Sequence, residues 1–188
     1  MFSKKKGEYG YITKSKRFDI IKMLLYIIVA VAVFVAGLLV NDMSYQNIFT
    51  IIAILFVLPW ARVLVEFVVF FPYKSPRQED YSRVKQAASK EATVASDVVI
   101  TSSEKSMGLS FLVMGNGYVF GLIMNEKQKE EEIQTYLKNG VHNWSNQYQV
   151  KIHKKMDSFL KDVENAKEKE IPDKERENVE KYVFSLFV

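Results

Sequence analysis

The 188-residue chain contains no cysteine, and this absence excludes several kinds of chemistry. Without thiols the protein forms no disulfide bond, no thiolate metal site and no cysteine nucleophile. The absence also suits a domain that faces the reducing cytosol, where disulfides are rare.

The chain also lacks the common nucleotide-binding and nucleophile motifs. Neither a phosphate-binding loop nor a dinucleotide fingerprint occurs, and the run Gly115 to Gly117 is typical of a hairpin turn. No Gly-x-Ser-x-Gly elbow or Ser/Lys pair is present to activate a serine. The only histidines, His142 and His153, are interpreted as incidental surface residues rather than metal ligands. The sequence therefore predicts no cofactor, no metal and no catalytic residue.

Two long apolar segments dominate the N-terminal part of the chain. They run from Met23 to Val40 and from Ile48 to Phe71, and the seven residues Asn41 to Asn47 separate them. A bilayer core about 30 Å thick is crossed by roughly 20 helical residues. We therefore expect a transmembrane helical hairpin over residues 23–72, preceded by a basic arm (1–22). The first segment is longer than a signal-peptide core and has no small-x-small cleavage pattern after it, which favours an uncleaved anchor.

The distribution of charge predicts the orientation of the hairpin. Residues 1–22 hold seven bases and two acids, the hairpin loop holds no base, and residues 73–188 hold eighteen charges of each sign. Because Lys and Arg near the ends of spans stay cytoplasmic, we expect a multi-pass protein of the cytoplasmic membrane with both termini in the cytosol. The seven bases are expected to face anionic lipid headgroups or simply to orient the hairpin: Lys4, Lys5, Lys6, Lys14, Lys16, Arg17 and Lys22.

A charge pair interrupts the second apolar segment. Arg62 and Glu66 are four residues apart and so share one helix face. Charges within a membrane mark a functional site or a packed pair. The alternative is that Arg62 snorkels to the cytoplasmic headgroups while Glu66 lies at the interface, and this is the interpretation that we favour.

The remaining residues predict one small domain. A connecting helix is expected over residues 73–96, with Ser75 as its N-cap, and a cytosolic α/β (α+β) domain over 97–188. Three strands (97–101, 109–114 and 118–124), a helix (127–139) that stops at Gly140, a fourth strand (149–153) and further helices follow. The order αβββαβα indicates a mixed sheet with helices packed against it.

This order resembles the restriction-endonuclease-like superfamily, and most closely its nuclease-related-domain branch. The matching stretch runs from Ser110 to Met124 and includes the glycine turn. The resemblance implies a catalytic Asp at position 110 and a Glu-x-Lys at 122 and 124, but Ser110, Leu122 and Met124 occupy these positions. Without carboxylates to hold a divalent cation, that chemistry is lost. The layout of two spans followed by such a domain is similar to that of small bacterial membrane proteins.

Three functions are compatible with the sequence. The favoured one is a membrane-anchored, non-catalytic interaction or scaffold module, with the lipid bilayer and either a protein partner or a second copy as its partners. A small accessory subunit of a transporter or channel, with Arg62 and Glu66 in its pathway, is an alternative. The other alternative is a membrane-tethered nuclease that uses residues such as Asp97, Glu104 and Lys105. The balanced charge of residues 73–188 argues against a nucleic-acid partner.

Overall fold

The computed structural model describes residues 5–102 and 105–188. Within these residues the chain forms two compact units. One unit is the apolar hairpin, Thr13–Pro72, and the other combines the residues up to Ile12 with Tyr73–Val188. Each unit has its own architecture.

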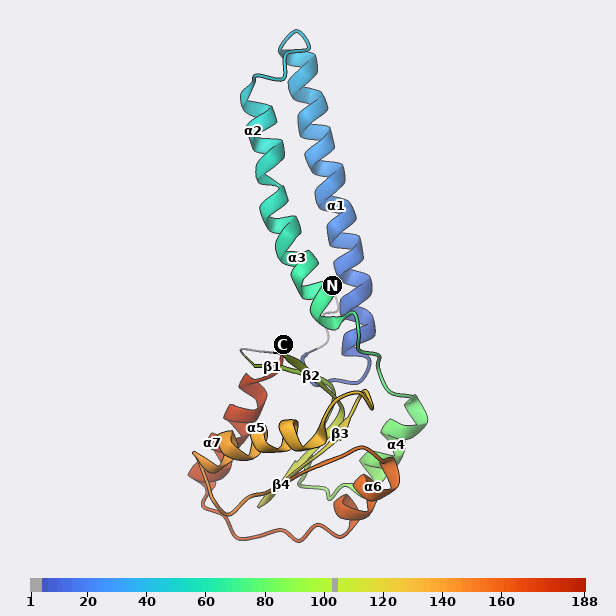
Figure 1. Cartoon of the computed structure of the whole chain (residues 1–188), viewed down its shortest axis with the longest axis vertical. Coiled ribbons are helices and arrows are strands. Elements are labelled where there is room, and N and C mark those ends of the chain that lie inside the picture. Colours follow the sequence, from blue (N-terminus) through green and yellow to red (C-terminus); the bar gives the residue numbers. More distant parts are fainter. Residues whose placement is uncertain (1–4, 103–104) are drawn as a thin grey trace. The chain divides into compact units, whose positions relative to one another are not determined.

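The hairpin consists of α1 (Tyr11–Val40), α2 (Ile48–Leu55) and α3 (Val57–Phe70), which run side by side in Figure 1. The structure thus has two helical segments, Tyr11–Val40 and Ile48–Phe70, that are long and apolar enough to cross a membrane. Most of their large apolar side chains are exposed, unlike those of a core helix in a soluble protein. Helix α1 begins twelve residues before the predicted span at Met23, so four of the seven bases of the arm lie on it.

A break at Phe56 separates α2 from α3. Pro59 causes it, because a proline has no N–H to donate to the carbonyl four residues earlier, at Leu55. The Phe56 N–H instead bonds the Ala53 carbonyl at 3.3 Å, and the helix then resumes.

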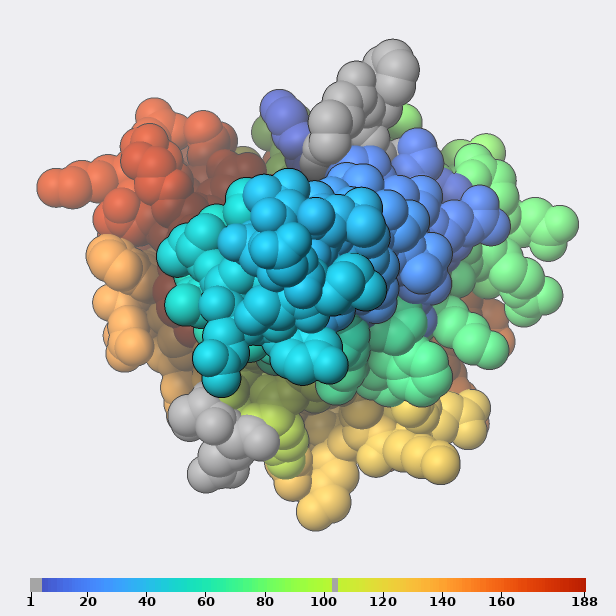
Figure 2. All heavy atoms as spheres, turned by 90° about the horizontal axis from the view of Figure 1, so that it is seen from above, coloured from blue at the N-terminus to red at the C-terminus, as the bar shows by residue number. Residues whose placement is uncertain are grey.

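The turn between the two helical segments is closed by its own backbone and side chains (Figure 2, cyan). The Met43 N–H donates to the Leu38 carbonyl at 2.9 Å, which caps the end of α1, and Asp42 has a positive φ of 47°. The Asn47 side chain then accepts the Thr50 N–H at 3.0 Å and caps α2. These caps define a tight turn that needs no further partner.

The second unit is a mixed α/β domain, as predicted. Its sheet has the strand order β1 (Thr93–Thr101), β2 (Ser106–Gly115), β3 (Tyr118–Ile123) and β4 (Gln149–His153). The first three strands are antiparallel, and β4 is parallel to β3 because α5 (Glu130–His142) crosses over between them. Helices α4 (Gln78–Ala87), α6 (Met156–Glu164) and α7 (Asp173–Ser185) complete the unit.

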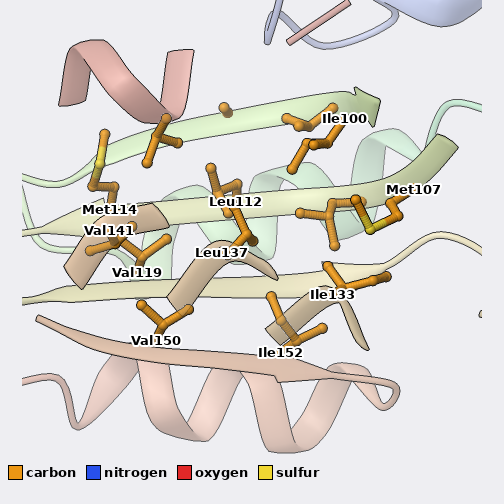
Figure 3. Packing of buried hydrophobic residues seen from close by; sticks show 14 of the residues in the cluster. Ile100, Met107, Leu112, Met114, Val119, Ile133, Leu137, Val141, Val150 and Ile152 are labelled. Carbon is orange, nitrogen blue, oxygen red and sulfur yellow. The ribbon is translucent and has the colours of Figure 1, made fainter. Parts of the chain in front are cut away.

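Helices cover both faces of this sheet. On one face α5 and α7 pack against the larger core, in which Leu112, Val119 and Leu137 interdigitate (Figure 3). On the other face α4 and α6 contribute Val84 and Phe159 to a second core around Phe111. Burial on both faces explains why the strands are almost continuously apolar.

Several predicted boundaries differ from the structure. The connecting helix ends at Ala87 rather than near 96, and β1 begins at Thr93 rather than at 97. The prediction that Gly140 stops α5 is wrong, since the helix continues to His142. A side chain at Gly140 would collide with the Tyr182 ring of α7, so this glycine allows two helices to approach closely. Ser75 is not the N-cap of α4 either; that position is Arg77.

Candidate functional site at the Asp97 carboxylate

Asp97 lies at an irregular point of the sheet. In the β1–β2 ladder Ser96 pairs with Phe111 and Val98 with Leu109, whereas Asp97 and Ser110 between them are unpaired. Asp97 has a φ of 55°, in the left-handed region that a residue in a strand rarely adopts. Because Asp is among the few residues that tolerate this conformation, the local sequence permits the kink. Backbone strain of this kind often accompanies a functional constraint.

The kink turns the Asp97 side chain to a buried position, with only 2% of the residue exposed. Its Oδ2 accepts the backbone N–H of Gly10 at 2.7 Å, and the Ile12 N–H faces the same carboxylate. Its Oδ1 accepts a short hydrogen bond from the Ser75 hydroxyl. Donors from two distant segments of the chain therefore meet at one carboxylate.

The Gly10 and Ile12 amides are among the orphan N–H groups at the start of α1. Every helix leaves its first N–H groups without intrahelical acceptors, and a carboxylate there also interacts favourably with the helix dipole. Asp97 supplies this cap from a strand 87 residues away in the sequence. The start of α1 is thus fixed to β1, and Ile12 is fully buried.

Further contacts make the N-terminal segment part of the domain. The Ser96 N–H donates to the Gly7 carbonyl at 2.9 Å, and the Lys6 ammonium donates to the Phe187 carbonyl at 2.9 Å. The rings of Tyr9 and Tyr81 lie 5.0 Å apart. Residues 5–12, the last before the hairpin unit, are therefore bonded to β1 at Ser96 and Asp97.

The segment that follows the hairpin is held beside the same strands. Tyr73 is only 4% exposed, and its ring lies on Gly108, where a Cβ would collide with it. The Tyr73 hydroxyl donates to Ser106 Oγ at 3.0 Å. With the bond from Ser75 to Asp97, the entry and the exit of the hairpin are tied to β1 and β2. We call Gly10, Ile12, Tyr73, Ser75 and Asp97 the hairpin latch.

Two opposing effects act on the Asp97 carboxyl group. Burial raises its pKa, because the charged form loses hydration, while the hydrogen bonds from Ser75 and Gly10 lower it. All the donors around the carboxylate suit the ionised form, which only accepts hydrogen bonds. The latch therefore depends on donors that compensate a buried charge.

The predicted pair in the apolar hairpin is present. Arg62 Nε lies 3.7 Å from Glu66 Oε1, with 84% of the arginine side chain exposed. Lys22 Nζ lies 3.4 Å from Asp19 Oδ1 on α1, and Asp19 and Glu66 are close enough to interact electrostatically. These two ion pairs lie near the domain-side end of the hairpin, where Lys14, Lys16 and Arg17 of α1 are also located.

The bases of the predicted arm occupy different surroundings. Lys16 donates to the Phe71 carbonyl at 2.8 Å and so caps the end of α3, while Lys22 lies 5.2 Å from the Phe18 ring. Lys6 bonds the domain, as described above. Lys4 lies outside the described residues, and Lys5, Lys14 and Arg17 have exposed or half-buried positions along the segment and on α1.

The positions expected from the nuclease resemblance contain no acid. Leu122 is buried in the core beside α6, Met124 follows β3, and Ser110 lies at the kink with its hydroxyl 3.5 Å from the Ile123 carbonyl. Of the alternative catalytic residues, Asp97 belongs to the hairpin latch and Lys105 pairs with Glu132. Glu104 lies outside the described residues. No group of three or more His, Asp or Glu side chains suited to a metal occurs in the described part of the chain.

Both histidines are half-buried rather than fully exposed, and their interpretation as residues that bind no metal stays a prediction. His142 Nε2 lies 3.2 Å from the Tyr148 carbonyl, and His153 Nε2 lies 3.3 Å from Asp162 Oδ2 with 14% of the histidine side chain exposed. Burial lowers the pKa of His153, and the Asp162 carboxylate partly opposes this effect.

The sequence does not predict the hairpin latch, although one member, Asp97, is unusual in its sequence context. An acidic residue in a run of β-branched residues is unusual unless its charge is compensated. The distant partners, by contrast, have no sequence signature. No protein-family model matches the chain, and no curated protein or solved structure matches it either.

Proposed function

We propose that this protein is an integral protein of the cytoplasmic membrane, in which a two-helix anchor carries a non-catalytic α/β interaction module on the cytosolic side. The observation that carries the proposal is the exposed apolar surface of the hairpin. Both helical segments have the length needed to cross a bilayer, and only 6% of their most apolar windows is buried. Such a surface requires an apolar environment.

The position of the charges supports insertion up to the domain-side end of the hairpin. Arg62 lies one helical turn, roughly 6 Å, closer to the hairpin turn than Glu66 does. Glu66 is close enough to Asp19 to interact with it electrostatically, so Arg62 lies toward the domain-side end of the second apolar segment. Because the Arg62 side chain is largely exposed there, it can extend to the lipid phosphates. The same geometry disfavours a transport pathway through these charges.

The hairpin latch supports the idea that anchor and module act together. Both segments that connect to the hairpin are bonded to β1 and β2 rather than forming free linkers. The anchor confines the module to the membrane surface. That restriction is useful when the module must meet a membrane-bound partner or a second copy of itself, because it raises the effective concentration.

The absence of acids at positions 110, 122 and 124 supports a non-catalytic role. Two of these positions, Leu122 and Met124, carry apolar side chains, and Leu122 is part of the core. If the domain has the endonuclease-like fold that it resembles, this fold serves binding here rather than cleavage.

Purification of the full chain from its native membranes tests this function. We expect the protein to resist extraction by alkaline carbonate, to dissolve in a mild non-ionic detergent, and to elute with a stoichiometric partner or as a defined homo-oligomer. The matched control is a variant with Leu24 and Leu25 changed to Arg, which should lose membrane association. Release of the unmodified chain by carbonate, or elution as a bare monomer, would contradict the proposal.

A further inference from the structure

A pocket of about 330 Å³ opens where β3 and β4 begin, next to the end of α6. Its polar lining comes from one strand, a helix and the segment after that helix. The members are Gln149 and Lys151 on β4, Asp162 on α6, and Asn165, Lys167 and Lys169 beyond it. We call it the lysine pocket. Its volume lies at the lower end of the range, about 300–1,000 Å³, that is typical of small-molecule sites.

Lys169 is held in place by three separate contacts. Its backbone N–H donates to the Asn116 carbonyl at 3.0 Å, and its ammonium donates to the Gln147 carbonyl at 2.7 Å. Its aliphatic stem crosses Gly117, which has a φ of 92° and leaves space for it. An ammonium group has three donors, and the bond to Gln147 uses one of them. Lys169 is an exposed lysine whose position these three contacts restrain.

Lys151 is positioned from the opposite side of the pocket. Its ammonium donates to Asp162 Oδ2 at 2.9 Å, the same oxygen that lies 3.3 Å from His153 Nε2. Asp162 is thus shared between two basic side chains. The Glu168 carboxylate accepts the Ser89 hydroxyl at 2.7 Å and remains a negative charge near Tyr118, which lines the pocket.

The balance of charge in the lysine pocket favours an anion. Three lysines and one aspartate contribute to its lining, with Lys151 paired to that aspartate, whereas residues 73–188 as a whole hold equal numbers of each sign. Cations gathered in a concave site reinforce one another and attract anions more strongly than they do on an open surface. Lysine ammonium groups bind phosphate oxygens as point charges.

The pocket has an apolar side as well. Phe120 and Tyr118 contribute to its lining, and their rings stack with centroids 5.0 Å apart. Only 2% of Tyr118 and 3% of Phe120 is exposed, so the two residues present a small apolar edge to the pocket. We propose that the lysine pocket binds a small organic phosphate, with its phosphate group between Lys151, Lys167 and Lys169 and its carbon skeleton toward Phe120. This inference does not depend on the membrane anchor.

Isothermal titration of the full chain in a non-ionic detergent tests this inference, with ribose 5-phosphate, ribose and inorganic phosphate as probes. Ribose 5-phosphate should bind, and ribose should not. Lys169→Met keeps the aliphatic stem over Gly117 and should weaken binding about 10-fold, which corresponds to the loss of one charge-assisted contact. The matched control Lys174→Ala, at an exposed lysine outside the pocket, should leave affinity unchanged.

The Asp162→Asn variant distinguishes an effect of Asp162 on ligand binding from an effect on the fold. Removal of this carboxylate frees Lys151 and removes a repulsion, so affinity for ribose 5-phosphate should rise about 3- to 10-fold. If Asp162 only stabilised the fold, its replacement would lower the affinity for ribose 5-phosphate or leave it unchanged. Absence of binding at millimolar ribose 5-phosphate, equal loss in Lys169→Met and Lys174→Ala, or equally tight binding of inorganic phosphate would each overturn the inference.

Discussion

Replacement of Asp97 separates the two physical roles that we assign to it. The Asp97→Ala change removes the acceptor of the Gly10 and Ile12 amides and of the Ser75 hydroxyl. A buried donor left without a partner costs about 1–3 kcal/mol, although the serine hydroxyl can rotate to another acceptor. Alanine at a φ of 55° adds about 1 kcal/mol of backbone strain. The domain should therefore lose about 3–7 kcal/mol of unfolding free energy, from two amides and the strain.

Two further variants distinguish hydrogen bonding from strain. Asp97→Gly also removes the acceptor but relieves the strain, so it should be about 1 kcal/mol more stable than Asp97→Ala. Asp97→Asn keeps one carbonyl acceptor and tolerates the left-handed conformation, so its loss should be the smallest, about 1–2 kcal/mol. Asp157→Ala, at an aspartate whose side chain is 95% exposed, is the control and should change stability by less than about 0.5 kcal/mol.

Urea unfolding of the full chain in detergent, followed by near-ultraviolet circular dichroism, measures these differences. A double-mutant cycle with a variant that lacks residues 1–10 adds a direct test of the latch. In that background the Gly10 donor is absent while Ile12 and Ser75 remain, so Asp97→Ala should cost about 1–3 kcal/mol less than in the full chain. An equal cost in both backgrounds would refute the cap, and equal stability of the alanine and asparagine variants would refute the hydrogen-bonding argument.

Three other predictions concern the hairpin charges, pH and catalysis. Glu66→Gln should hardly change expression or assembly if Arg62 extends to the headgroups; a loss of several kcal/mol of assembly that a double leucine variant reverses would instead reveal a desolvated pair. Because burial lowers the pKa of His153 below 6.5, the folded state binds fewer protons than the unfolded state. Stability should accordingly be complete above about pH 6.5 and fall as the pH decreases through the folded pKa, and His153→Gln should flatten this decrease in a pH series of urea titrations. The purified chain should neither bind Mg²⁺ or Mn²⁺ specifically nor cut nucleic acid, and metal-dependent cleavage that disappears in Asp97→Asn would favour the nuclease alternative.

Local patterns in the sequence were enough to predict the elements of the fold. The apolar runs predicted two helical segments, and the run Gly115 to Gly117 predicted the β2–β3 hairpin that the structure shows. The fourth strand was predicted with its observed bounds, Gln149–His153. These features depend on periodicity and turn chemistry, which neighbouring residues determine.

The hairpin latch could not be predicted in this way, because its parts are distant in the sequence. Asp97 and Gly10 are 87 residues apart, and no local sequence pattern around either residue indicates that they are in contact. The predicted basic arm, residues 1–22, did not include the start of α1 at Tyr11, and the reason is related. Polar residues from Tyr11 onward continue the helix because its first turn is capped by the domain. Tertiary contacts determine both the hairpin latch and the start of α1.

Cysteine accessibility across the membrane tests the central claim, that a membrane hairpin holds the domain on the cytosolic side. The chain has no natural cysteine, so a single introduced thiol reports one position without background. An impermeant maleimide should label Ser44→Cys, in the exposed hairpin turn, in intact cells, and should label Ser158→Cys, on the exposed side of α6, only after lysis. Labelling of Ser158→Cys in intact cells, with protection of Ser44→Cys, would contradict the account.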